Sequence, residues 1–235
     1  MFSGTFATAS TGSLPLTDPI DDPAGIITDP IDDPAGTITG GVLTSENARA
    51  LLEQGTDVVI PEGVTSIGEW AFGETLLTSV ELPSTLTSIG NAAFGLTPLT
   101  SVVIPEGVTS IGENAFRDTQ LTSVELPNTI TSIGDGAFEG TQLTIVVIPE
   151  GVTSIGDNAF AQTQLTSVQL PSTLTSIGDY AFEGTPLTSV VIPEGLTSIA
   201  DSAFGADVDQ ITGVRHSFNL DVDGDGFVTP LGDGL

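Results

Sequence analysis

The stretch Leu99–Phe116, "LTSVVIPEGVTSIGENAF", recurs in close variants along most of the chain. Phenylalanine recurs every 22 residues, at Phe72, Phe94, Phe116, Phe138, Phe160, Phe182 and Phe204. Proline keeps the same step from Pro61 to Pro193. A strict period without insertions indicates that each repeat is one coil of a solenoid, in which every residue stacks on its equivalent in the next coil.

The β-branched segment "TSVVI" at 100–104 predicts a short strand within each coil. Alternation along the strand directs Val102 and Ile104 inward and Ser101 and Val103 outward. The strand ends at Pro105, because proline has no N–H to donate to a ladder.

A second extended stretch is expected at 108–112, "VTSIG", followed by a single helical turn at 113–116. The acidic or amide residue after the glycine is expected to cap that turn. The apolar residues assigned to the core of this coil are Leu99, Val102, Ile104, Val108, Ile111, Ala115 and Phe116.

Equivalent strands are expected to pair in parallel at about 4.8 Å per coil. One coil cannot bury both sides of its phenylalanine, so the stack needs caps. The segment "TSENARALLEQG" predicts an N-terminal capping helix that starts at Thr44 or Ser45 and stops at Gly55. The solenoid domain is therefore placed at 42–212.

Composition excludes several classes of protein. The 235 residues carry a net charge of −28, with no cysteine, no lysine, three arginines and one histidine. Cys–His catalysis, a lysine Schiff base and Cys/His zinc sites are impossible, and a Ser–His triad would depend on His216 alone. The charge opposes binding to nucleic acid and to anionic membranes, and it favours cations. No enzymatic activity is expected.

The first 41 residues are expected to be an acidic, proline-rich linker. They contain "TDPIDDPAGII" followed at once by "TDPIDDPAGTI". A cation site at Asp18, Asp21 and Asp22 is the alternative interpretation of this segment. The N-terminus shows neither a basic region nor an apolar run typical of a signal peptide, so the protein is expected either to stay inside the cell or to be represented here by an excerpt.

The last segment, 213–235, predicts a calcium loop. Asp221, Asp223 and Asp225 alternate before Gly226, and the carbonyl of Phe227 is a further ligand. This spacing resembles the opening half of a dockerin-type calcium repeat, which makes Ca²⁺ the expected cofactor. Position 12 of such a loop is Gly232 instead of a carboxylate, and an acidic turn without metal is the alternative.

Two columns of polar residues and one variable position stand out. An acidic column starts at Glu69 and ends at Asp201, and it is interpreted as caps or as a calcium-bridged ladder. Threonine columns at 65 to 197 and 78 to 188 suggest the alternative function of binding an ice or mineral lattice. Trp70 and Tyr180 share a position of varied composition, which is expected to be exposed.

A second period of 44 residues runs through the repeats, since "VVIPEG" alternates with "VELPST" or a close variant. The outward strand positions carry valines between acids, and exposed apolar stripes mark interaction sites. The alternation sets the acids of this face about 9.6 Å apart. The predicted partner-binding residues are Ser101, Val103, Ser123, Glu125, Val147, Ser167 and Gln169.

The pattern L-x-x-V-x-I-P-x-x-V-x-x-I-G-x-x-A-F resembles the BspA-type leucine-rich repeat over residues 58 to about 206. Many members carry a cysteine in a 23-residue unit, where this 22-residue unit has Thr119, Thr141 and Thr163. The resemblance implies a right-handed leucine-rich-repeat solenoid. It also implies a noncatalytic bacterial protein, secreted or at the cell surface, that binds proteins or extracellular matrix.

Overall fold

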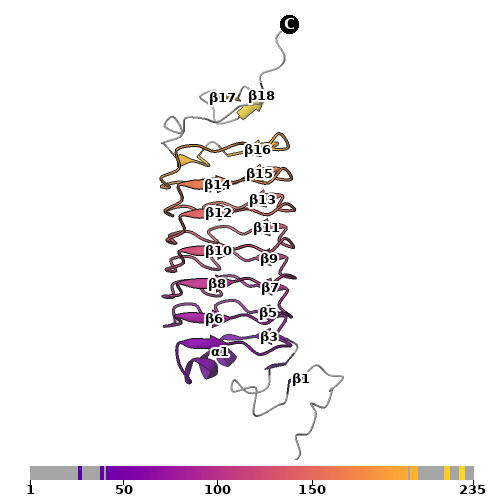
Figure 1. Cartoon of the computed structure of the whole chain (residues 1–235), viewed down its shortest axis with the longest axis vertical. Coiled ribbons are helices and arrows are strands. Elements are labelled where there is room, and N and C mark those ends of the chain that lie inside the picture. Colours follow the sequence, from indigo (N-terminus) through magenta and orange to yellow (C-terminus); the bar gives the residue numbers. More distant parts are fainter. Residues whose placement is uncertain are drawn as a thin grey trace, which may run out of the picture.

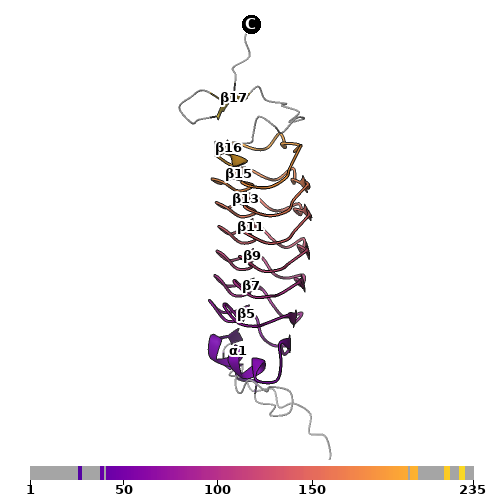
Figure 2. The same cartoon turned by 90° about the vertical axis from the view of Figure 1, so that its left-hand side faces the viewer.

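The computed structural model describes residues 26–27, 38–39, 41–200, 202–205, 220–222 and 228–230, with side chains for 41–200 and 202–205. Coils of 22 residues stack into an elongated solenoid with α1 (Ser45–Leu52) at one end (Figures 1 and 2). Its strands form two columns (Figure 1). The predicted fold class is confirmed.

One column is an eight-stranded parallel sheet that runs through every coil. From Ser66 onward its strands pair with a shift of one whole repeat, so that Ile111 lies beside Ile89 and Ile133. In order along the chain they are β3 (Val42–Leu43), β5 (Ser66–Ile67), β7 (Ser88–Ile89), β9 (Ser110–Ile111), β11 (Ser132–Ile133), β13 (Ser154–Ile155), β15 (Ser176–Ile177) and β16 (Ser198–Ile199).

The other column is paired two by two. It consists of β4 (Asp57–Val59), β6 (Ser79–Glu81), β8 (Ser101–Val103), β10 (Ser123–Glu125), β12 (Ile145–Val147) and β14 (Ser167–Gln169). Three separate parallel sheets result, made of β4 with β6, β8 with β10, and β12 with β14. The 44-residue period of the sequence is thus a period of the structure.

The core is a column of phenylalanine rings surrounded by aliphatic side chains. Neighbouring rings stack with centroids 5.2–5.5 Å apart and planes within 5–10° of parallel. The assigned core residues of the coil Leu99–Phe116 are all buried. Thr119, Thr141 and Thr163 are also fully buried, and each donates its hydroxyl to the carbonyl of the phenylalanine three residues before it. This internal hydrogen bond satisfies a buried polar group.

The capping helix is confirmed. Thr44 is its N-cap, and its side chain accepts a hydrogen bond from the N–H of Asn47 at 3.4 Å. Asn47 accepts in return from the N–H of Thr44 at 3.3 Å, which completes a capping box. Ala48 and Leu51 are buried and cover the end of the core.

The expected helical turn after each glycine is wrong. Residues 69–72 and their equivalents form tight turns, with the second residue at positive φ, as at Asn114 (54°) and Gly136 (59°). Alternate amides of these turns donate to the next coil, as from Phe72 to Ala93 at 2.8 Å. Within the described residues α1 is the only α-helix. The turns therefore form a third column of hydrogen bonds between coils.

Two short antiparallel pairs lie outside the solenoid. Strand β1 (Ile26–Ile27) pairs with β2 (Ile38–Thr39), within the segment predicted to be a linker. Strand β17 (Leu220–Val222) pairs with β18 (Val228–Pro230) in the predicted calcium segment. Asp18, Asp21 and Asp22 lie outside the described residues, and the domain boundaries stay predictions.

Candidate functional site

The outer surface of β4, β6, β8, β10, β12 and β14, here called the strand face, holds the predicted partner-binding residues. All seven residues are exposed, with Val103 at 71% and Val147 at 55%. Val103 lies beside Glu125, and Val147 lies beside Gln169, across paired strands. The structure thus brings the predicted residues together on one face, while their role in binding stays a prediction.

Side chains after the proline link the two coils of a pair, and sequence reasoning missed this function for them. Glu62 accepts hydrogen bonds from the N–H (3.0 Å) and hydroxyl (3.1 Å) of Ser84 in the next coil. Gly63 donates its N–H to the Thr85 hydroxyl at 3.0 Å, and that hydroxyl donates to the carbonyl of Val64 at 2.7 Å. We call this set of bonds a clamp.

The clamp recurs only within the pairs. Glu106 accepts from Asn128, and Glu150 accepts from Ser172, as Glu62 does from Ser84. At the junction that follows each pair the order is reversed, because the preceding coil carries serine or asparagine followed by threonine and the next coil carries Glu–Gly. The glycine has no side chain that could accept a hydrogen bond from an N–H of the preceding coil. In the described range 41–200, no backbone hydrogen bond joins β6 to β8 or β10 to β12. We call these two unpaired boundaries seams. The alternation of Glu–Gly with Ser–Thr or Asn–Thr was the sequence signal for them.

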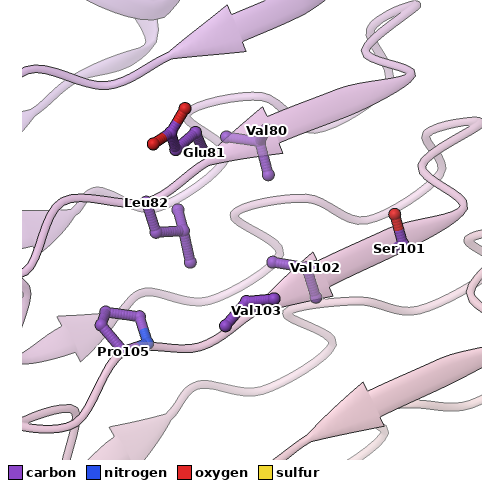
Figure 3. Close-up of a pocket in the computed structure, with 7 residues that line it drawn as sticks. All are labelled: Val80, Glu81, Leu82, Ser101, Val102, Val103 and Pro105. Atoms are coloured by element: carbon purple, nitrogen blue, oxygen red, sulfur yellow. The ribbon is translucent and has the colours of Figure 1, made fainter.

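A hollow of about 380 Å³ lies at the first seam, between β6 and β8. Figure 3 shows Leu82 projecting from the end of β6 toward the neighbouring coil, where Val103 and Pro105 lie. Glu81 points away from that hollow, at its edge. The complete lining is Val80, Glu81, Leu82, Ser101, Val102, Val103 and Pro105. The site is thus an apolar groove with a carboxylate at its rim.

The clamps lower the pKa of two exposed glutamates. The largest cause is the hydrogen bond that each carboxylate accepts from the backbone N–H in the next coil, from Ser84 for Glu62 and from Ser172 for Glu150. Because these bonds favour the charged form, the pKa of both groups lies below its ordinary value. The clamps are therefore strongest with both carboxylates ionised.

Some members of the acidic column link neighbouring coils instead of capping their own turns. Asp135 accepts from the N–H of Asp157 at 2.9 Å, and Asp157 accepts from that of Asp179 at 2.8 Å. Asn91 accepts in the same way from the N–H of Glu113. Among the residues whose side chains are described, no group of three or more acidic or histidine side chains is arranged to hold a metal ion.

The threonine columns also bond between coils. The hydroxyls of Thr87, Thr109 and Thr131 each donate to the carbonyl of the equivalent threonine one coil earlier. Thr78 and Thr166 do the same in the second column. These hydroxyls are engaged within the protein, and nothing in the structure supports binding to an ice or mineral lattice.

The position of Trp70 and Tyr180 is not uniformly exposed. Both aromatic side chains are exposed, at 45% and 44%, but Ala92 at the same position is 4% exposed. All three have positive φ, at 53°, 58° and 49°. Bulky residues rarely adopt this conformation, so the surrounding turn imposes it.

Of the predicted calcium ligands, Asp221 alone is among the described residues. The backbone of Asp221 lies in β17, opposite Thr229 of β18. Asp223, Asp225 and Phe227 lie outside the described residues.

Parallel strands, a repeat of 22 residues and a stacked phenylalanine core together define a β-solenoid of the leucine-rich-repeat class. The family model described as the BspA type leucine rich repeat region matches six copies within residues 52–155 and 89–212, well over half of the chain. This protein belongs to the BspA-type leucine-rich repeat family.

Solved structures of leucine-rich repeat proteins are similar to it. One from Bacteroides ovatus ATCC 8483 is 28% identical, over 63% of this chain and 46% of that one, with a TM-score of 0.51. One from T. pallidum is 32% identical, over 55% and 63%, with a TM-score of 0.50. A leucine rich cell surface protein from Faecalibacterium prausnitzii A2-165 is 31% identical, over 65% and 51%, with a TM-score of 0.43. The matched region spans less than two thirds of each.

A comparison with curated proteins finds no significant match. Among the described residues, no helix has the length and apolar character needed to cross a membrane.

Proposed function

We propose that this protein is a noncatalytic binding or adhesion module, secreted or held at a bacterial cell surface, that recognises a protein or extracellular-matrix partner through the strand face. The observation that carries this proposal is the row of exposed valines on a hydrogen-bonded scaffold, with Val103 71% and Val147 55% exposed. Apolar side chains at such positions contribute little to folding, and an apolar stripe of this kind suits a partner. Membership of the BspA-type family supports the proposed location.

The test measures binding of the full chain to an immobilised panel of purified matrix proteins by surface plasmon resonance. We expect Val103→Arg combined with Val147→Arg to weaken binding at least tenfold, because each large charged side chain prevents close packing at the face. Leu76→Arg is the control, since Leu76 is 76% exposed and does not lie on the strand face.

Unchanged affinity of the double variant, with its circular dichroism spectrum intact, would move the site to the turns that carry Trp70 and Tyr180. Binding to no member of the panel by the parent chain would count against the adhesion role.

For the C-terminal segment, the proposed cofactor is Ca²⁺, bound by Asp221, Asp223, Asp225 and the carbonyl of Phe227. The spacing of the three carboxylates supports it. Calorimetric titration of the full chain with calcium is expected to show heat that disappears when Asp221→Ala and Asp225→Ala are combined. Heat that survives both changes would refute the loop.

A further inference from the structure

The strand face exposes an additional apolar side chain at every second coil. After β4, β8 and β12, the residues Ile60, Ile104 and Ile148 are only 3–4% exposed. After β6, β10 and β14, the equivalent leucines are half-buried, and they are Leu82, Leu126 and Leu170. The leucines that follow β6 and β10 lie at the seams, where the next strand is not hydrogen-bonded to their own. Each seam therefore presents a partly open apolar side chain, and the hollow of about 380 Å³ at the first seam shows that space is available beside it.

Charge indicates the chemistry of an occupant. Glu81 and Glu125 are exposed at the ends of β6 and β10, next to the two seams. The whole chain carries a net charge of −28, and Arg49 and Arg117 are the only basic residues in the described solenoid. Arg117 is engaged with Glu139 at 3.2 Å. A segment with basic side chains is attracted to this face, whereas a second copy of the chain is repelled.

Spacing indicates the conformation of that segment. Successive seams are two coils apart, and equivalent phenylalanine rings of neighbouring coils lie 5.2–5.5 Å apart, so two coils advance the stack by about 10.4–11.0 Å. A polyproline II segment returns a side chain to the same side every three residues, or about 9.3 Å, which is within about 2 Å of the step from one seam to the next. A β-strand returns one every two residues, or about 6.7 Å, and loses register with the seams.

We propose that the two seams bind one polyproline II segment of the partner, lying along the solenoid axis, with a basic side chain at every third residue. The basic side chains lie against Glu81 and Glu125, and the proline rings between them cover Leu82, Leu126 and Val103. This inference rests on the proposed binding role of the strand face and adds the chemistry and repeat of its partner.

The experiment measures binding of fluorescent synthetic peptides to the full chain by anisotropy, at low and at high salt. The first peptide repeats Pro-Pro-Lys six times, the second has the same composition with its lysines clustered at one end, and the third is a helix with a lysine every seven residues. We expect the first peptide to bind at least tenfold more tightly than either of the others, and its affinity to fall as salt rises.

Two double variants locate the binding. Glu81→Gln with Glu125→Gln is expected to weaken binding of the first peptide at least fivefold, and the chain itself carries Gln169 at the equivalent position. Glu69→Gln with Glu113→Gln removes two exposed charges from the turns and is expected to change affinity less than twofold.

Equal affinity for the repeated and clustered peptides, preference for the helical peptide, or equal losses in the two double variants would overturn the inference. If matrix binding remains sensitive to Val103→Arg while the Pro-Pro-Lys peptide fails to bind, the inference fails and the proposed function stands. If the peptide binds at the seams while no matrix protein binds, the inference about the seams stands and the proposed adhesion role fails.

Discussion

Each phenylalanine of the core is shared between two junctions. An inner ring such as Phe138 stacks on Phe116 and on Phe160, at 5.4 Å from each. The ring is fully buried. Removing one ring therefore leaves a cavity that two neighbouring coils border, and neither coil can move into it without breaking its hydrogen bonds.

Phe138→Ala is expected to destabilise the solenoid by about 3–5 kcal/mol, because a large buried side chain is replaced in a closely packed stack. Chemical denaturation followed by circular dichroism measures the change. Val103→Ala serves as the control and is expected to stay within about 0.5 kcal/mol, since its side chain is 71% exposed. Equal stability of Phe138→Ala and the parent would show that the ring does not support the core.

At the scale of the element, the clamp explains why the strands pair two by two. The Thr85 hydroxyl accepts a hydrogen bond from one residue of the preceding coil and donates to another, so it holds that coil at two points. Glu62 holds the same junction through its carboxylate. All these bonds join the two coils of one pair. None of them crosses the junction to the following pair.

The clamps make stability depend on pH in the acid range. The pKa of Glu62 and Glu150 is lowered in the folded state, chiefly by the Ser84 and Ser172 amides. Their contribution is fully present above the pKa of an unfolded glutamate, about 4.3, and is lost as the pH falls through the lowered folded pKa.

We expect Glu62→Gln with Glu150→Gln to reduce the fall in melting temperature between about pH 6 and pH 3, compared with the parent. Thermal melts at low salt measure it. Glu69→Gln with Glu113→Gln is the matched control, because neither of its carboxylates bonds to another coil in the described solenoid. The role of the clamps would be contradicted if the melting temperature of the clamp variant fell as steeply as that of the parent. It would also be contradicted if the melting temperature of the control fell as little as that of the clamp variant.

The period of the sequence predicted the coils, the inward residues and the parallel register. A strict 22-residue step places Phe116 on Phe138 only when every residue is aligned with its equivalent in the next coil. The left-handed turns were missed, although glycine and asparagine at Gly136 and Asn114 are typical of positive φ. Trp70 concealed the pattern, since a bulky residue adopts that conformation only where the coils around it impose it. The seams were missed because the alternation of residues was interpreted as a way to space the acidic side chains. The hydrogen bonds of these residues join different coils, so they can be identified only in the structure.

At the scale of the whole molecule, the described solenoid contains two kinds of junction in alternation, one clamped and one with a seam. Both kinds keep the eight-stranded sheet, the turn column and the phenylalanine stack. In a solenoid, stability is approximately a sum over coils and their junctions, so the order of the junctions affects cooperativity. Removing an odd number of coils is therefore expected to affect the cooperativity of unfolding differently from removing an even number.

Deleting residues 102–145 removes one clamped junction and one seam and leaves the alternation intact, so we expect a single cooperative unfolding transition. Deleting residues 102–123 joins two coils of the same kind and loses the Glu106–Asn128 and Gly107–Thr129 bonds, each worth about 1 kcal/mol. We expect that shorter deletion to give the broader transition in urea, although it removes fewer residues. Transitions of the same steepness in both variants would show that the junctions are equivalent.

The seams also have a mechanical consequence. Two of the three hydrogen-bonded columns run through every coil, whereas the strand face is joined only within pairs. Opening a seam stretches no backbone hydrogen bond between β6 and β8, so the solenoid resists bending least in the direction that spreads its strand face. The strand face can therefore change its curvature in steps of two coils, and we expect the proposed partner to make it stiffer when it fills the seams.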